Sequence, residues 1–130
     1  MFPLLTSSTG QVFAAHLSES VVETIIEQEL AKLAQSDTAR APRTREEVDA
    51  LLVEVRERGL ARGVGIRRPG INSFSVPVFD YRGNMSFAVT AFGYEDTFDP
   101  DWNGPIAKEL CRTARELSAQ LGYTTAQSAR

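Results

Sequence analysis

Hydrophobic residues recur at the spacing of an α-helix in the first part of the chain. Residues 7–17 begin with small hydroxyl side chains and continue with an apolar series, which predicts a short helix. Its N-cap, whose side chain accepts from the first free backbone amides, is expected at Ser7, Ser8 or Thr9. A second helix is predicted to start at Ser18 or at Ser20, where Ser20 and Glu23 have the spacing of a capping box. It is expected to present an apolar face interrupted only by Glu29.

Two further helices are marked by their ends. Thr44 and Glu47 have the spacing of a capping box, and Gly59 follows the last apolar position of the same pattern. We therefore predict a helix between Thr44 and Gly59. Near the C-terminus, Pro105 suits the first turn of a helix whose apolar positions continue until Gly122.

After Gly59 the hydrophobic pattern changes to a period of two, which is typical of β-strands. Strands are predicted over residues 60–66, 72–79 and 85–93, the last two joined by a turn into an antiparallel hairpin. Pro77 cannot donate to a ladder, so an edge position or a bulge is expected there. This order of predicted helices and strands indicates one α+β domain over residues 1–123, followed by a flexible tail at 124–130.

The predicted hairpin has two unlike faces. One face is bulky and apolar and suits packing against helices, and it comprises Phe74, Val76, Val78, Met85, Phe87, Val89 and Ala91. The other face is small and hydroxyl-bearing, with Ser73, Ser75, Thr90 and Phe92 among its members. Such a face is either solvated or the floor of a ligand cavity. The first amides of the 7–17 helix, at Ser8, Thr9 and Gly10, would suit a carboxylate if that helix end lies over this face.

Charge and length exclude several classes of protein. The chain has 130 residues, with 17 acids against 14 bases and a net charge of −3. Because the bases are scattered, the longest run being Arg67-Arg68, binding of DNA or RNA by this chain alone is not expected. No apolar run approaches the roughly 20 residues that a membrane helix requires. A single cysteine, Cys111, excludes an internal disulfide and favours a reducing, cytoplasmic compartment.

The sequence offers little catalytic or metal-binding chemistry. His16 has no second metal ligand at a suitable spacing, so we interpret it as structural or surface-exposed. Cys111 lies among apolar helix positions, where a cysteine behaves as a small hydrophobe. Three aspartates before the last helix lack the glycine and terminal glutamate of a calcium loop: Asp96, Asp99 and Asp101. We expect neither an enzyme, nor a metal site, nor a cofactor.

The hairpin sequence GINSFSVPVFDYRGNMSFAVTAFG resembles the signature hairpin of IclR-type transcriptional regulators, in their C-terminal effector-binding domain. Three other stretches resemble the same domain: TSSTGQVFAAHLSE, EEVDALLVEVRERGLA and ELCRTARELSAQLGY. The resemblance runs from about Leu4 to about Tyr123. It implies a profilin- or GAF-like antiparallel sheet with helices, which senses a small molecule, often a carboxylic acid or an aromatic metabolite. It also implies that the first part of that domain and the DNA-binding winged helix-turn-helix precede this segment.

The resemblance also implies positions for ligand contacts. These are Ser8, Thr9, Gly63, Ser73, Thr90 and Phe92. The family position that is often acidic falls on Gly63 or its neighbour Val64, and this chain has no acid between residues 60 and 71. Phe92 stands where the family has a serine, which favours a larger or more apolar ligand over a small keto acid. Gly10 and Ser75 complete the candidate site, on the residue pattern described above.

These observations predict a sensing domain that binds a small organic effector, passing its signal to a DNA-binding domain outside this chain. The alternative is a ligand-free dimerisation or interaction module derived from the same domain. An incomplete sheet exposes strand edges that another chain tends to cover, so we expect a homodimer or a higher homo-oligomer. No membrane partner is expected.

Overall fold

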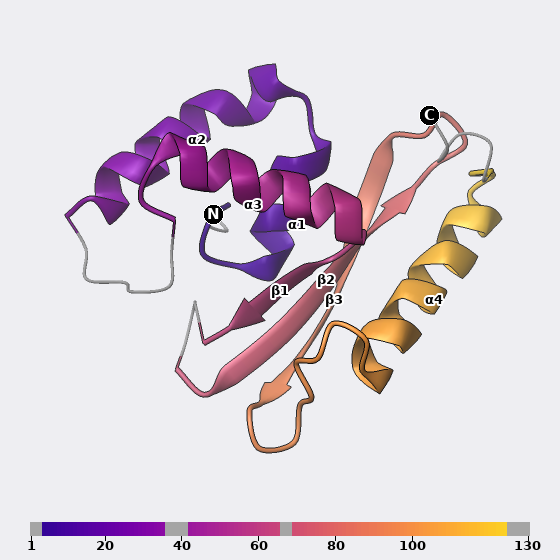
Figure 1. Cartoon of the computed structure of the whole chain (residues 1–130). Helices are drawn as coiled ribbons and strands as arrows, with labels where there is room; N and C mark the ends of the chain where they lie inside the picture. The colour runs from indigo at the N-terminus through magenta and orange to yellow at the C-terminus, as the bar shows by residue number, and fades with distance from the viewer. Residues whose placement is uncertain (1–3, 36–41, 66–68, 125–130) are drawn as a thin grey trace.

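The computed structural model describes residues 4–35, 42–65 and 69–124. Three helices come first, then three strands, then a last helix (Figure 1). They are α1 (Ser8–His16), α2 (Glu19–Leu33), α3 (Arg45–Arg58), β1 (Ala61–Val64), β2 (Ile71–Phe79), β3 (Met85–Tyr94) and α4 (Pro105–Gln120). The predicted α+β order is confirmed. Most of the expected tail, residues 125–130, lies outside the described residues.

The three strands form one antiparallel sheet in the order β1-β2-β3. In this register Ser73 of β2 lies between Gly63 of β1 and Phe92 of β3, and Ser75 lies opposite Thr90. Pro77 belongs to the central strand, but it lies past the end of β1, whose first residue pairs with Ser75. Its missing N–H therefore costs no ladder bond, which agrees with the edge position predicted for it.

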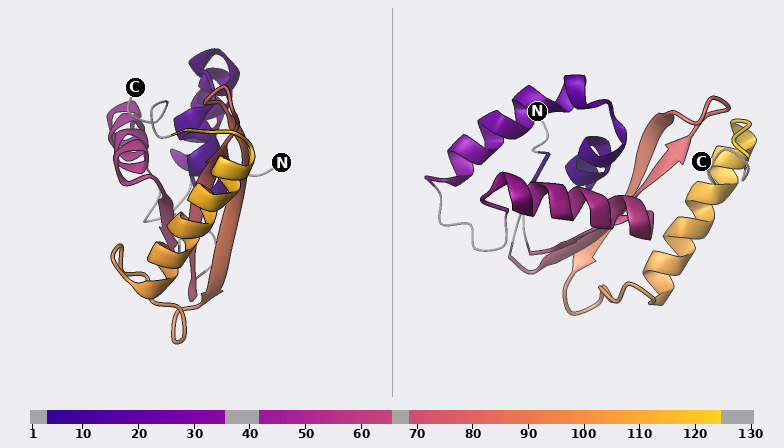
Figure 2. Two further views of the ribbon diagram at one scale, coloured as in Figure 1. Left: turned by 90° about the vertical axis from the view of Figure 1, so that its right-hand side faces the viewer. Right: turned by 45° about the horizontal axis from the view of Figure 1, so that its top comes forward.

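Helices cover both faces of the sheet (Figures 1 and 2). The apolar face packs against α4 and the loop before it, in a core that includes Phe74, Val76, Val78, Phe98, Leu110 and Ala114. On the opposite side, α1 lies over β2 and β3, and α2 and α3 pack around α1. The hydroxyl-bearing face is thus partly covered by a helix. Neither of the two environments expected from the pattern, solvent or a ligand cavity, describes it fully.

The caps of the helices follow the sequence signals, with one exception. Ser7 is the N-cap of α1, and Thr44 caps α3 by accepting from the amide of Glu47 at 3.2 Å. The second helix begins after Ser18, which confirms one of its two predicted starts, whereas the capping box predicted at Ser20 and Glu23 is wrong. The acid of that expected box, Glu23, instead accepts two bonds of 2.9 Å from Arg45. Glu23 therefore does not cap α2 but forms a bidentate carboxylate–guanidinium pair that joins α2 to α3.

Glu29, the polar interruption in the apolar face of α2, has a structural role. Its carboxylate accepts from the backbone amides of Leu4 at 2.8 Å and Leu5 at 3.0 Å. These bonds hold the segment before α1 against α2, and both leucine side chains join the core.

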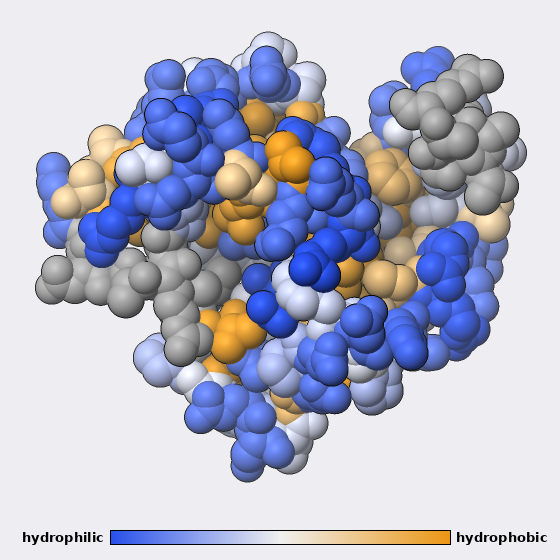
Figure 3. Space-filling view, viewed as in Figure 1, coloured by the Kyte–Doolittle hydropathy of each residue, from blue (hydrophilic) through white to orange (hydrophobic). Residues whose placement is uncertain are grey.

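Figure 3 shows the outer side of α4 as hydrophilic, with apolar side chains visible mainly in the seams between elements. Among the described residues, no helix combines the length and apolarity needed to span a bilayer.

Candidate functional site

Five hydroxyl side chains meet where the start of α1 lies over the sheet. Ser8 and Thr9 come from the first turn of α1, Ser73 and Ser75 from β2, and Thr90 from β3. We call this group, Ser8, Thr9, Ser73, Ser75 and Thr90, the hydroxyl cluster. Alternation along the strands places the three sheet residues on one face, and the N-cap at Ser7 fixes where the helix enters. Five of the nine predicted site residues are thereby brought together.

The hydroxyl cluster is one continuous hydrogen-bonded network. The Ser8 Oγ lies 2.7 Å from the Ser73 Oγ and 3.0 Å from the Ser75 Oγ. The Thr90 Oγ1 lies 2.6 Å from both the Thr9 Oγ1 and the Ser75 Oγ, and the Thr9–Ser75 distance is 3.2 Å. Ser8 and Ser75 are buried, whereas Thr90 is exposed. The network therefore runs from the core to the surface, and its solvent-exposed end is Thr90 of β3.

Hydroxyl groups can both donate and accept, and their protons rotate to suit a partner. An anionic ligand at the Thr90 end would need donors, which Thr9 and Thr90 supply by turning their O–H bonds outward. The amides at the start of α1 add partial positive charge at the same place. One amide predicted for this role is already used, because the N–H of Gly10 donates to the Ser7 Oγ at 3.0 Å. The amides of Ser8 and Thr9 are the remaining candidates from that helix start.

The other predicted site residues lie around the cluster. Phe92 is 74% exposed on the hydroxyl-bearing face, opposite Ser73, and forms an apolar wall beside the cluster. Gly63 is buried opposite Ser73 on the other side, where a side chain would point toward the same face. Val64 lies opposite Asn72, whose side chain faces the other way and donates to the carbonyl of Phe98 at 3.4 Å. Val64 is therefore not brought to the cluster.

The residues considered for catalysis and metal binding make contacts that stabilise the fold. Burial of the imidazole is the main cause that lowers the pKa of His16, and the positive charge of Arg56 lowers it further. The His16 ring packs edge-on against Phe79, with 5.3 Å between the two ring centroids. Burial raises the pKa of the Cys111 thiol, which keeps it protonated. Within residues 4–35, 42–65 and 69–124, no group of three histidine, cysteine or acidic side chains could hold a metal ion. Asp99 and Asp101 accept from nearby backbone amides and so shape the loop before α4.

A groove of about 450 Å³ lies between the end of α3 and α4, and the sequence pattern did not predict it. Its lining includes Arg58, Trp102, Lys108, Arg112 and Arg115. The guanidinium of Arg58 lies 4.1 Å from the centre of the Trp102 ring. The spacing of cations along α4 was the available signal, but nothing in the sequence placed Arg58 or Trp102 beside that helix face. The groove lies on the α4 side of the sheet, away from the hydroxyl cluster.

Comparison with known proteins agrees with this fold. Residues 1–119 match the family model described as the bacterial transcriptional regulator IclR C-terminal domain. A curated relative is the DNA-binding transcriptional repressor YiaJ of Escherichia coli (strain K12), 26% identical over 125 residues. That match covers 94% of this chain and 43% of the repressor.

Solved structures give the same result. The crystal structure of Pseudomonas aeruginosa HmgR is 38% identical, with a TM-score of 0.81 over 95% of this chain and 46% of HmgR. A double mutant of the inducer-binding domain of the PobR transcription factor from Acinetobacter, in complex with 3-hydroxybenzoic acid, has the same fold. It is 20% identical, with a TM-score of 0.73 over 90% of this chain and 66% of that domain. The chain spans about half the length of YiaJ and HmgR.

Proposed function

The chain belongs to the family of bacterial transcriptional regulators that share the IclR C-terminal domain, and we propose that it senses a small organic effector for such a regulator. Residues 1–123 form the C-terminal portion of the sensing domain, and 124–130 are a tail. The domain acts by binding and not by catalysis, in the cytoplasm and as a homo-oligomer. DNA is contacted through a separate DNA-binding domain, to which effector binding is passed as a shift between conformations.

The observation that carries this proposal is the hydroxyl cluster at the surface end of the α1–sheet contact. Small-molecule sites combine apolar and aromatic side chains with a few polar groups that fix the orientation of the ligand, and the cluster and Phe92 supply both kinds of group. Ser8, Thr9 and Thr90 supply donors, and Phe92 supplies apolar contact area. A double mutant of the PobR inducer-binding domain, of the same fold, is known in complex with 3-hydroxybenzoic acid.

The chemistry of the cluster favours an aromatic or apolar carboxylate as effector. Hydroxyls and helix-start amides are donors that suit an anion, and none of the five cluster residues is an acid that would repel it. Phe92 would pack against a ring or alkyl group by offset or edge contact. Ser73 and Ser75 would orient the ligand indirectly, through the hydroxyls of Ser8 and Thr90 to which they bond.

A second function, a ligand-free interaction module, is favoured by a different observation. The cluster hydroxyls are already bonded to one another at 2.6–3.2 Å, so they need no ligand to be satisfied. In that case the network would serve only to dock α1 on the sheet. Binding experiments separate the two functions, because only a sensor gains stability from a small molecule.

A thermal-shift screen of aromatic and aliphatic carboxylates tests the proposal. A ligand that binds the native state raises the melting temperature by mass action. Thr90→Val removes one hydroxyl at the open end of the cluster and should weaken the best ligand by roughly 0.5–1.5 kcal/mol, the value of one neutral hydrogen bond.

Ser86→Ala is the matched control. Ser86 is an exposed hydroxyl on the same strand, past the irregular pairing at Val78 and Phe79, four residues from Thr90 and so roughly 14 Å away. It should leave affinity unchanged. If no carboxylate stabilises the chain, or if both variants weaken binding equally, the sensor function is wrong and the interaction module is favoured.

A further inference from the structure

The groove between the end of α3 and α4, here called the α3–α4 groove, concentrates positive charge in an acidic chain. Among the described residues, four bases and one acid line it, namely Arg58, Lys108, Arg112, Arg115 and Glu109. The chain as a whole has 14 bases against 17 acids. Positions 108, 112 and 115 follow one another at spacings of four and three residues, so their side chains share one face of α4. This excess of bases makes the groove a candidate site for an anionic partner.

The acid in the lining does not neutralise the groove. Glu109 pairs with Arg112, which also bonds to Glu116 at 2.6 Å, so the charges of these three residues balance among themselves. Within the described part of the chain, the side chains of Lys108 and Arg115 make no hydrogen bond or ion pair, and both are exposed. Seven residues of helix separate them by roughly 10 Å along the axis. Two cations are therefore left without a carboxylate partner.

Trp102 holds two further guanidinium groups at the inner side of the groove. The guanidinium carbons of Arg58 and Arg62 lie 4.1 Å and 4.3 Å from the centre of the indole ring. Arg62 also donates to the carbonyl of Pro100 at 3.0 Å, whereas Arg58 has only an exposed ion pair with Glu54 at 3.6 Å. A guanidinium stacked on an aromatic ring keeps its N–H edges free for an oxyanion. Arg58 is thus an ordered third cation.

The groove has an exposed rim and an apolar floor. Arg58, Lys108 and Arg115 are exposed, and Leu60 and Ala107 are buried. A small-molecule site usually encloses most of its ligand, so an open groove of this kind better suits an extended segment of polypeptide. Alternate side chains of an extended segment lie roughly 7 Å apart, so three alternate acids span about 13 Å and reach both Lys108 and Arg115. A single carboxylate would engage only one of these cations.

We propose that the α3–α4 groove binds an acidic segment of a partner protein in extended conformation. Alternate carboxylates of the segment pair with Lys108, Arg115 and Arg58, and the side chains between them contact the apolar floor. The proposal goes beyond effector sensing and does not depend on it, because the groove and the hydroxyl cluster lie on opposite sides of the sheet.

The surroundings of the groove are compatible with such a partner. The groove lies beside β1, an edge strand of four residues that carries Arg62, and both its shortness and its charge discourage pairing with a further strand. The acidic remainder of the chain repels an acidic partner only weakly, since the screening length at physiological salt is about 8 Å. The ion pairs at the exposed rim are screened as well, so binding should weaken as the salt concentration rises.

Tryptophan fluorescence of the whole chain tests the proposal, because its single tryptophan, Trp102, lies in the groove. The probe is a synthetic peptide in which glutamate and alanine alternate over eight positions. Its control has glutamine in place of glutamate, which keeps the length and removes the charge. We expect a saturable, salt-sensitive change in emission with the glutamate peptide and none with the glutamine peptide.

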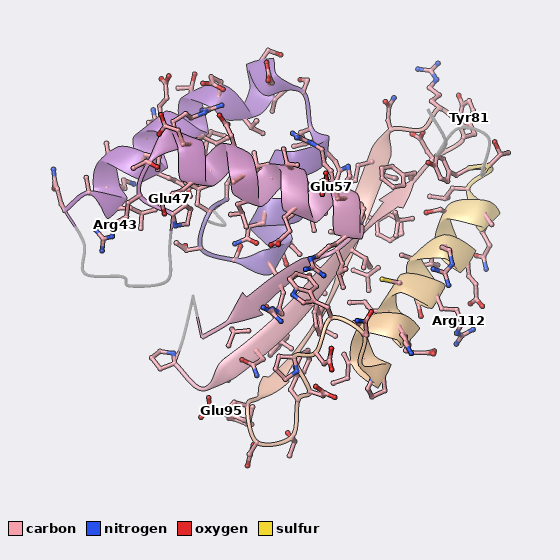
Figure 4. All side chains as sticks on the ribbon, viewed as in Figure 1. Arg43, Glu47, Glu57, Tyr81, Glu95 and Arg112 are labelled. Atoms are coloured by element: carbon pink, nitrogen blue, oxygen red, sulfur yellow. The ribbon has the colours of Figure 1, made fainter. Side chains whose placement is uncertain are left out.

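Charge-neutralising variants locate the site. Each of Lys108→Gln and Arg115→Gln should weaken the glutamate peptide about two- to fivefold, the usual value of an exposed ion pair. Neither side chain has a partner within the described part of the chain, so the fold should be unaffected. Arg82→Gln is the matched control, because Arg82 follows Tyr81 in the hairpin turn by the C-terminal end of α4, away from the groove face that carries Arg112 (Figure 4). It should leave the affinity unchanged.

Inorganic triphosphate and citrate form the last arm of the experiment, since they carry several negative charges without an extended chain. They should bind more weakly than the glutamate peptide. Equal or tighter binding of either anion would overturn the proposal and make the groove a site for small anions. The proposal would also be overturned if the glutamate peptide gave no saturable change, or if Arg82→Gln weakened it as much as Lys108→Gln does.

Discussion

At the scale of single residues, the contacts of the hydroxyl cluster were harder to predict than its members. The pattern of the hairpin placed Ser73, Ser75 and Thr90 on one face, and the helix start placed Ser8 and Thr9 near it. Short hydroxyl side chains bond to whichever group lies within about 3 Å, and sequence periodicity does not fix distances of that size. The position of Val64 was likewise not predictable from the sequence. Val64 pairs with Asn72, and alternation along the strand therefore places its side chain on the face opposite the hydroxyl cluster.

His16 makes the stability of the fold depend on pH. Burial and the Arg56 guanidinium, whose Nε donates to the carbonyl of Ala15, lower the pKa of His16 below its ordinary 6.5. Between the lowered and the ordinary pKa the unfolded chain binds the proton and the folded chain does not, so acid favours unfolding. This contribution is complete above pH 6.5 and is lost as the pH falls toward the lowered pKa.

We therefore expect His16→Gln, which is neutral throughout, to reduce the acid sensitivity of the melting temperature. The measurement is thermal unfolding of wild type and variant between about pH 5 and pH 8, the range in which histidine titrates. The stability difference between the two proteins should shift in favour of the variant as the pH falls. Parallel curves would contradict the assignment.

At the scale of elements, local signals were reliable where the partner groups are local. Thr44 with Glu47 and the glycine at 59 were identified because a cap is formed by residues adjacent in sequence. The start of α2 at Ser18 was among those predicted, but the capping box at Ser20 was misjudged because Glu23 bonds to Arg45, which is 22 residues away. The same reason explains why the sequence did not indicate which helix covers which face of the sheet. Such contacts depend on long-range packing.

Two glycines of the left-handed region are predicted to differ in how they tolerate a methyl group. Gly59, which ends α3, has φ +78° and nothing within 4 Å of an added Cβ, so Gly59→Ala should cost about 1–2 kcal/mol of backbone strain alone. Gly122 has φ +90°, and an added Cβ would lie 2.9 Å from the Cβ of Tyr81. Gly122→Ala should therefore destabilise more in urea unfolding. Equal losses would show that the Tyr81 contact is not maintained in solution.

At the scale of the whole molecule, charge limits what the chain can bind by itself. The net charge is −3, and the adjacent pair Arg67 and Arg68 lies outside the described residues. We expect no measurable binding to duplex DNA at physiological salt, because association with the phosphate backbone requires a concentrated positive surface. A gel-shift titration of the isolated chain checks this. Salt-sensitive binding in the micromolar range would contradict it, and would make the cations along α4 the first surface to examine.

The layered arrangement explains how a sensor could be built from this chain. The α4 side of the sheet is an apolar core, whereas the α1 side reaches the surface through a network of hydroxyls. A ligand that replaced hydrogen bonds within that network would act on the contact between α1 and the sheet. In the sensor function proposed above, this contact is where effector binding would be passed to the rest of a longer regulator.

The central claim, an effector bound at the hydroxyl cluster, is tested most directly by an amide NMR titration of the whole chain with carboxylates. The account predicts saturable shifts concentrated at Ser8, Thr9, Ser73, Thr90 and Phe92 for at least one aromatic carboxylate, with the amide of Arg115 in the α3–α4 groove unchanged. Shifts centred on that groove, or no saturable shift at the cluster with any carboxylate tested, would contradict it.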